Sequence, residues 1–282
     1  MIINKEEGVI VLILKNCTKS FKKTKALNDF SCEFKHGIYG LLGPNGSGKT
    51  TMMRCICGLL SPEKGSIECD CENIGYLPQQ FGAMKSLTVY ETMRYFATLK
   101  KIPKSNQDNE IRYCIDLVNL SDKIKNKVGS LSGGMVRRLG IAQAIMGNPE
   151  IVLFDEPTAG LDPEERVRFK SLLRKIKNDK TIIISTHIVS DVKSICDEIV
   201  IINEGRNVVQ GTCSDITSIG NENVFLLGEE YENNLEGNYY VKDRISKDNK
   251  NYIIVLSSNF IEQGVSINAD IEDGYLCALK DI

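Results

Sequence analysis

The sequence of 282 residues lacks an excess of charge of one sign and a long apolar run. Its net charge is -2, whereas a nucleic-acid-binding surface usually comes with a strongly basic composition. No apolar run approaches the roughly 20 residues that a helix needs to cross a bilayer. The first 16 residues place acidic side chains before only about six apolar ones, which is a poor signal peptide. We therefore expect a cytoplasmic protein that binds no nucleic acid.

A zinc-type cysteine spacing is also missing, although the chain has ten cysteines. They occur as Cys55-x-Cys57, as Cys69-x-Cys71 and as six scattered residues. None gives the C-x-x-C pairs of a zinc site, and cytosolic thiols stay reduced. We interpret the cysteines as small apolar residues of the core rather than as metal ligands. With 42% apolar and 26% charged residues, the chain is long enough for one large α/β domain and a small appendage.

One stretch matches the phosphate-binding pattern G-x-x-x-x-G-K-[ST]. It consists of Gly43, Pro44, Asn45, Gly46, Ser47, Gly48, Lys49, Thr50 and Thr51. An apolar run at 38–42 precedes it and predicts a buried strand, and 51–60 predicts a helix that ends near Ser61-Pro62. Glycines let the backbone N–H groups surround an anion at the helix N-terminus. We expect Lys49 to reach the β- and γ-phosphates and Thr50 to bind Mg²⁺.

A second candidate group follows the buried apolar run at 151–154, namely Asp155 and Glu156. Acidic residues at the carboxyl end of such a strand lie where doubly wound sheets bind ligands. Asp155 is expected to hold Mg²⁺ and Glu156 to polarise a water molecule near a γ-phosphate. The alternative is solvation of a strand end, which the neighbouring phosphate loop makes the weaker interpretation.

Four further residues carry little functional information when each is taken alone, and an ordinary structural role is then the favoured interpretation for Phe21, Ser132 and His187. Phe21 could stack on a purine or be an ordinary core or surface residue. Gln79, in the loop after the expected strand 73–77, could simply satisfy backbone groups. Ser132 is a natural N-cap before Gly133-Gly134, and His187 follows a buried strand at 181–185.

The order of elements alternates strands and helices. Beyond those named above, we expect strands at 9–15, 26–34 and 66–69 and a hairpin of strands at 198–203 and 206–210. A helical insertion without strands is expected at 86–130, with a polar connector at 100–109. Further helices are expected to begin at Ser132 and at Asp162, and another to span 191–196. In 213–282 we expect strands at 224–227, 239–242 and 252–256 and a closing helix at 271–279.

GPNGSGKTT, LSGGM, IVLFDEPTAGLDP and STH follow one another in an order that closely resembles the nucleotide-binding subunit of ABC transporters. The resemblance covers 9–212. It implies that Phe21 stacks on adenine, that Gln79 touches Mg²⁺ and senses the membrane partner, and that His187 is a switch residue. It also implies that Glu156 is the catalytic base. Ser132, Gly133 and Gly134 would cap the γ-phosphate of the ATP bound to the opposite subunit, and 159–162 would cross the dimer.

Two departures from the family pattern stand out. Met135 replaces the usual glutamine of the signature, which puts the contribution of that side chain in question. The short segment between Lys49 and Gln79 predicts a β-subdomain that is smaller than usual. Met135 and the closing IEDGYLCAL resemble the subfamily of small drug and peptide exporters.

The resulting prediction is an α/β P-loop NTPase core with an antiparallel β-subdomain, an α-helical subdomain at about 84–148 and a small β-rich C-terminal tail. The ATP-binding domain would span 1–212 and the tail 213–282. We expect an ATPase subunit that uses ATP and Mg²⁺, the latter held by Thr50, Gln79 and Asp155. Lys49, Glu156 and His187 would be the catalytic residues.

The expected partners are a separately encoded permease, exporting a drug, peptide or lipid-like molecule, and a second copy or a paralogue in an ATP-sandwich dimer. The subunit would lie on the inner face of the membrane through the permease. The alternative is a soluble ABC-type ATPase that is not coupled to transport, although the sequence has no second cassette, long coiled coil or zinc module. A regulator without turnover would lack Glu156 or His187.

Overall fold

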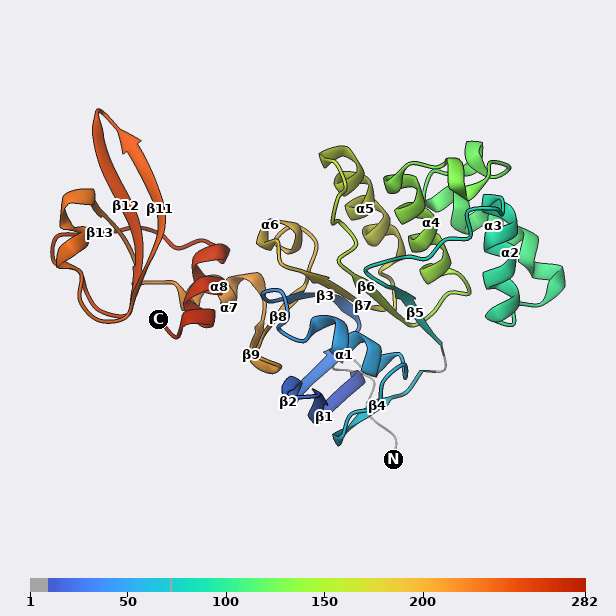
Figure 1. Ribbon diagram of the computed structural model, residues 1–282, viewed down its shortest axis with the longest axis horizontal. Helices are drawn as coiled ribbons and strands as arrows, with labels where there is room; N and C mark the ends of the chain where they lie inside the picture. The colour runs from blue at the N-terminus through green and yellow to red at the C-terminus, as the bar shows by residue number, and fades with distance from the viewer. Residues whose placement is uncertain (1–9, 72) are drawn as a thin grey trace.

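The computed structural model describes residues 10–71 and 73–282, and its elements form three β-sheets with helices packed around them (Figure 1). Residues 1–9 lie outside the described residues, and they include residue 9 of the expected first strand and the beginning of the segment interpreted as a poor signal peptide. The phosphate-loop strand belongs to the largest sheet, so this sheet positions the site.

The six strands of the central sheet have the order β5-β6-β7-β3-β8-β9. Their bounds are β3 (Gly37–Leu42), β5 (Ile74–Leu77), β6 (Ile151–Asp155), β7 (Thr181–Thr186), β8 (Glu198–Asn203) and β9 (Arg206–Gly211). All neighbouring pairs are parallel except β8 and β9, which form the expected hairpin. Because β6 and β7 are buried along their whole length, their apolar sequences are continuous rather than alternating.

The register explains why distant segments of the chain meet at one edge of this sheet. Ser185 of β7 is paired with Asp155 of β6 on one side and with Leu41 of β3 on the other. The phosphate loop starts directly after β3, so it begins in the same row as the acidic end of β6.

A second, antiparallel sheet has the order β2-β1-β4. It shares one apolar cluster with helix α1 (Lys49–Ile56) and with strands of the central sheet. Its strands are β1 (Ile10–Phe21), β2 (Thr24–Lys35) and β4 (Lys64–Cys69). The expected helix at 51–60 was wrong at its carboxyl end, because Gly58 adopts φ 70° just after the cap residue Cys57. A left-handed glycine at this position ends a helix.

The helical insertion contains α2 (Val89–Leu99), α3 (Lys104–Leu117), two short 3-10 helices (Ser121–Lys123 and Val128–Ser130) and α4 (Gly133–Ile145). Thr88 and Glu91 form a capping box at the start of α2. The polar connector expected at 100–109 was wrong, since α3 begins directly after Pro103. The polar residues of this segment lie mainly on the exposed face of the first turns of α3. Their polarity was therefore not evidence of a connector.

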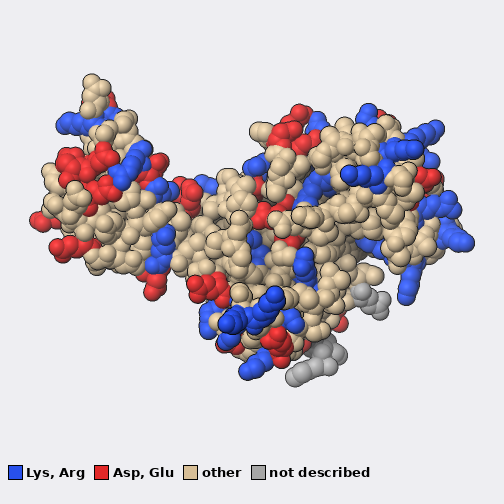
Figure 2. Space-filling model, in the orientation of Figure 1, with Lys and Arg blue, Asp and Glu red and all other residues tan. Residues whose placement is uncertain are grey.

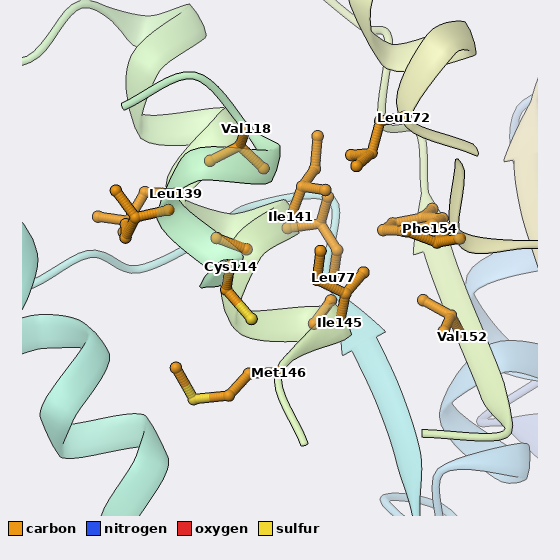
Figure 3. Close-up of a cluster of buried hydrophobic side chains, with 14 of the residues drawn as sticks. Leu77, Cys114, Val118, Leu139, Ile141, Ile145, Met146, Val152, Phe154 and Leu172 are labelled. Carbon is orange, nitrogen blue, oxygen red and sulfur yellow. The ribbon is translucent and has the colours of Figure 1, made fainter. Parts of the chain in front are cut away.

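Helix α4 joins the insertion to the central sheet through an apolar core. Figure 3 shows Ile141 and Ile145 of α4 between Cys114 of α3 and the sheet residues Leu77 and Phe154. All five side chains are buried, which fixes the position of α4 relative to β5 and β6.

Two helices follow the acidic strand and the histidine strand. Helix α5 (Pro163–Ile176) starts as expected, with Asp162 accepting a hydrogen bond from the Glu165 N–H at 2.9 Å. Helix α6 is shorter and earlier than the expected 191–196, because it spans only Val189–Val192.

The segment 213–282 contains a separate four-stranded sheet in the order β11-β12-β10-β13 (Figure 1). Its strands are β10 (Val224–Gly228), β11 (Tyr239–Lys247), β12 (Lys250–Ser257) and β13 (Val265–Ser266), and a 3-10 helix covers Glu229–Asn234. Helices α7 (Cys213–Ile219), which the sequence analysis did not anticipate, and α8 (Ile271–Lys280) connect this sheet to the main body. Ile216, Ile271 and Tyr275 share an apolar cluster with Val192 and Ile201. Helices α7 and α8 therefore bury side chains against the main body. The domain boundary at 212 stays a prediction.

Charge is distributed unevenly over the molecule (Figure 2). Residues 213–282 contain thirteen acidic and five basic residues, whereas 84–148 contain five acidic and eleven basic ones. Within 10–71 and 73–282, no helix is both long and apolar enough to cross a membrane.

Candidate functional site

A cavity of about 400 Å³ lies at the edge of the central sheet where β3 and β6 end. Nine of the residues predicted from the sequence line it, together with Ala26 of β2. They are Asn45, Gly46, Gly48, Lys49, Thr50, Thr51, Gln79, Asp155 and Glu156. The structure therefore brings the phosphate loop, the glutamine loop and the acidic strand end into one space.

The phosphate loop owes its tight path to glycine. Gly48 has φ 114°, and a Cβ added there would lie 2.2 Å from the carbonyl oxygen of Ala26. A Cβ on Gly43 would lie 2.2 Å from the carbonyl oxygen of Ile202. No other residue type fits either position without displacing backbone. The close packing places the start of α1 at the cavity, where its free N–H groups favour an anion.

Lys49 is buried in the loop and is only 6% exposed. Its Nζ donates to the carbonyl oxygens of Gly43 at 2.6 Å and Pro44 at 3.0 Å. Burial lowers the pKa of Lys49, and the nearby carboxylates of Glu156 and Asp155 act in the opposite direction. The loop thus holds a desolvated cation at the cavity, where its attraction for phosphate is stronger than in bulk water.

Asp155 is buried, with 1% of its surface exposed, and its two carboxylate oxygens differ in their contacts. Oδ1 accepts a hydrogen bond from the Ser185 hydroxyl at 2.6 Å. Oδ2 has no hydrogen-bond partner within the described part of the chain. A buried carboxylate oxygen without a donor is costly, and a hydrated or directly bound Mg²⁺ would satisfy it. Asp155, together with Thr50 and Gln79 in the same cavity, therefore fits a Mg²⁺ site.

Glu156 has a backbone conformation that is unusual for a residue other than glycine, with φ 51°. Its N–H donates to the hydroxyl of Ser185 at 2.9 Å. Both of its carboxylate oxygens lie 3.1 Å from Nδ1 of His187. While the carboxylate is ionised, Nδ1 must be the donor, and the imidazolium form could donate from Nε2 as well. The pair can therefore present a carboxylate and a ring nitrogen to the same ligand.

The predicted signature residues Ser132, Gly133 and Gly134 do not line the phosphate cavity of their own chain. Ser132 caps α4, its hydroxyl accepting a hydrogen bond from the N–H of Met135 at 3.3 Å. Gly133 lines a separate groove of about 320 Å³, with Phe81, Val136 and the 159–161 segment. Gln79 borders both this groove and the phosphate cavity. Gly134 starts α4 beside Gly133 and lines neither space.

The remaining predicted residues do not line the phosphate cavity. Phe21 is 46% exposed at the end of β1, with the Lys19 ammonium 5.9 Å from its ring centroid. Gly43, Pro44 and Ser47 lie within the loop itself, and Ser47 is buried.

Three residues of the site escaped the sequence analysis as functional candidates. Ala26 contributes only its backbone and surface, so no chemical signal marks it. Ser185 stands at the end of a buried strand, and pairing of β7 with β6 could have suggested its contact with Asp155. Arg137 was noted only as part of a helix. It donates to five carbonyl oxygens around the site.

Comparison with known proteins gives a consistent match. Residues 27–159 match the family model described as ABC transporter. The chain is 31% identical to the ABC transporter ATP-binding protein YxlF of Bacillus subtilis (strain 168), covering 92% of this chain and 90% of that protein. It is 31% identical to the Nod factor export ATP-binding protein I of Cupriavidus pinatubonensis (strain JMP 134 / LMG 1197), covering 79% and 73% respectively.

Among solved structures, the fold resembles a dimeric post-hydrolysis state of the ATP-binding cassette MJ0796 bound to ADP and Pi. The TM-score is 0.65 at 26% identity, covering 71% of this chain and 98% of that one. The predicted fold class, a P-loop NTPase cassette, is confirmed by this likeness and by the mixed arrangement of β-sheets and helices. The family recognised from the motifs is likewise confirmed, and this chain belongs to the ATP-binding proteins of the ABC transporter family.

Proposed function

We propose that this chain binds and hydrolyses ATP and that the hydrolysis drives a separately encoded membrane permease. The observation that supports hydrolysis most directly is the single cavity shared by Lys49, Gln79, Asp155 and Glu156. Phosphoryl transfer needs little covalent chemistry from a protein, so positioning and charge stabilisation are sufficient tasks for these groups.

Each group has a distinct task in this proposal. The N–H groups at the start of α1 and the Lys49 ammonium bind the β- and γ-phosphates. Glu156 orients or deprotonates the attacking water, because it lines the same cavity as the phosphate loop and its carboxylate can accept a proton. His187, which contacts that carboxylate, would hold Glu156 and stabilise charge on the transferred phosphoryl group.

Thr50, Gln79 and Asp155 would hold Mg²⁺ in this site. When bound, the ion neutralises charge on the phosphate oxygens. Ser185 holds Asp155 through its hydrogen bond to Oδ1, while Oδ2 has no hydrogen-bond partner among the described residues and so remains available to the ion.

A second copy or a paralogue would complete the site. Ser132, Gly133 and Gly134 do not line the phosphate cavity of their own chain, yet they form the free N-terminus of a 13-residue helix. Such a terminus binds anions, so an opposing subunit could bring it to the γ-phosphate. Phe21, at the rim of β1, would stack on adenine.

The proposed docking region for the permease lies at the helical insertion. The half-buried residues Phe81, Met84, Leu87 and Tyr90 run from the glutamine loop into α2. They would accept a short cytoplasmic helix of the permease. The basic excess in 84–148 fits a position near an anionic membrane surface. Export is the proposed direction because three relatives are named for Nod factor export.

Hydrolysis is tested by measuring phosphate release from ATP by the purified chain with Mg²⁺. We expect turnover that stops when EDTA removes the metal, and Lys49→Ala should abolish ATP binding in calorimetry without unfolding the chain. Unchanged nucleotide affinity in Lys49→Ala, or no turnover in the wild type with a partner present, would refute the proposal.

Coupling to a permease needs its own experiment. Cysteines introduced by Met84→Cys or Tyr90→Cys should crosslink to the co-expressed permease. Asp248→Cys, at the exposed tip between β11 and β12, is the control that should remain uncrosslinked. Crosslinks from position 248 alone would reject the docking region. Hydrolysis without any crosslink would favour the soluble ATPase.

A further inference from the structure

Arg137 lies in the second turn of α4, and all five of its guanidinium N–H groups find carbonyl acceptors. Nη1 donates to Pro78 and Gln79, each at 2.9 Å. Nη2 donates to Asp155 at 2.6 Å and to Glu156 at 2.7 Å. Nε donates to Pro157 at 3.3 Å. A planar donor set is thereby saturated by backbone alone.

The five acceptors belong to two segments that border the phosphate cavity. Pro78 and Gln79 form the glutamine loop after β5, and 155–157 form the acidic end of β6. These segments are more than 70 residues apart in the chain, and the Arg137 guanidinium bonds to both of them. A displacement of either segment therefore breaks charge-assisted hydrogen bonds unless α4 and the other segment follow.

Glu156 depends on this arrangement more than its neighbours do. Its φ of 51° is unfavourable for a residue with a Cβ, and such conformations persist only when surrounding contacts determine them. Ser185 holds the Glu156 N–H at 2.9 Å, and Arg137 holds the carbonyl oxygen of the same residue. The peptide groups on both sides of the unusual φ are thus fixed by hydrogen bonds.

We propose that Arg137 is a positioning residue that holds the Glu156 carboxylate in its working orientation and links it to the position of the Gln79 loop. The inference rests on the proposed role of Glu156 as the base. Movement of the Gln79 loop, on partner docking, would then change the orientation of the carboxylate through one side chain. Lysine could replace arginine only in part, since its three donors share one nitrogen and cannot span both segments.

The next residue along the helix provides a matched control. The Arg138 guanidinium donates to the carbonyl oxygens of Val118 at 3.1 Å and Asn119 at 2.8 Å. It also pairs with Glu165 at 3.1 Å. Arg138 therefore also holds backbone carbonyl groups of a distant segment and has an ion pair in addition, but none of its partners lines the phosphate cavity.

The test compares Arg137→Met, Arg137→Lys and Arg138→Met in the full chain. We expect Arg137→Met to lower kcat by about 10- to 100-fold, the range for a misplaced catalytic group. Its affinity for a non-hydrolysable ATP analogue should stay within about threefold, because that contact depends on the phosphate loop. Arg137→Lys should recover part of kcat. Arg138→Met should lower the melting temperature to a similar degree while changing kcat by less than about threefold.

Amide hydrogen exchange gives a readout that does not require turnover. In Arg137→Met, exchange should become faster at 79–82 and 156–161, and in Arg138→Met it should stay at the wild-type rate there. Equal kcat loss in both methionine variants, or wild-type exchange in Arg137→Met, would overturn the positioning role. If Arg137→Met does not fold, the same comparison is made with Arg137→Lys. Absence of hydrolysis by the wild type would refute the proposed function instead, and the exchange comparison would still decide the role of Arg137.

Discussion

Glu156→Gln is the substitution that most directly separates ATP binding from hydrolysis. Glutamine keeps the length and shape of the side chain, so an oxygen acceptor can remain for Nδ1 of His187, which now lies 3.1 Å from both carboxylate oxygens. What is lost is the negative charge and the ability to take a proton. The variant should therefore fold and bind ATP but fail to activate water.

The size of the effect follows from the contacts. Loss of a general base typically costs at least two orders of magnitude in kcat, which is about 2.7 kcal/mol of transition-state stabilisation. The stability should change by less than about 1 kcal/mol, because the partner His187 is half exposed and its attraction to Glu156 is screened. Glu156 also opposes the lowering of the Lys49 pKa by burial, so its removal should lower that pKa further.

ATP that is bound but not hydrolysed should accumulate between two subunits. We expect Glu156→Gln to elute as a dimer from a sizing column with saturating ATP and Mg²⁺, while the wild type returns to monomer after hydrolysis. The double variant with Ser132→Arg should elute as a monomer, since arginine adds bulk and charge at the free end of α4. Hydrolysis by Glu156→Gln at the wild-type rate would show that another group is the base. A monomeric Glu156→Gln would mean that the partner is a different subunit or that the shared site is incorrect.

Three further predictions concern the loop, the tail and the thiols. Gly48→Ala should abolish ATP binding in calorimetry, because the new Cβ would lie 2.2 Å from the Ala26 carbonyl oxygen, and retained affinity would contradict the loop geometry. A chain ending after Thr212 should melt at a lower temperature. Its free energy of unfolding should fall by about 1.5–3 kcal/mol for each apolar side chain that the removal of α7 and α8 uncovers. Its nucleotide affinity should stay within about tenfold, or 1.4 kcal/mol, and a complete loss in the folded form would place the tail in the site. Burial raises the pKa of Cys57 to about 12, so its reactive thiolate forms only as the pH approaches that value. Iodoacetamide at neutral pH should label the exposed Cys69 first, and equal labelling of Cys57 measured by mass spectrometry would refute this burial.

Local sequence signals identified much of the fold because they depend on near neighbours in the chain. The capping box of Thr88 and Glu91, the cap of α5 at Asp162 and the continuous apolar strand β6 all involve residues within a few positions of one another. Where a single residue decides an element end, prediction was weaker. Gly58 ends α1 earlier than the apolar pattern suggested, and Pro103 starts α3 within a stretch interpreted as a polar connector.

The sequence by itself determined the family, the phosphate loop and the identity of the acidic strand end, because each is a contiguous motif whose chemistry depends on residue type and spacing. Only the tertiary structure decided which groups meet. The pairing of β6 with β7 places Ser185 on Asp155, and the packing of α4 on the sheet brings Arg137 to two loops. These contacts join segments that are distant in the chain, whereas hydrophobic periodicity reports only the faces of single elements. The unusual φ of Glu156 belongs to the same category, because contacts from the distant elements β7 and α4 help to sustain it.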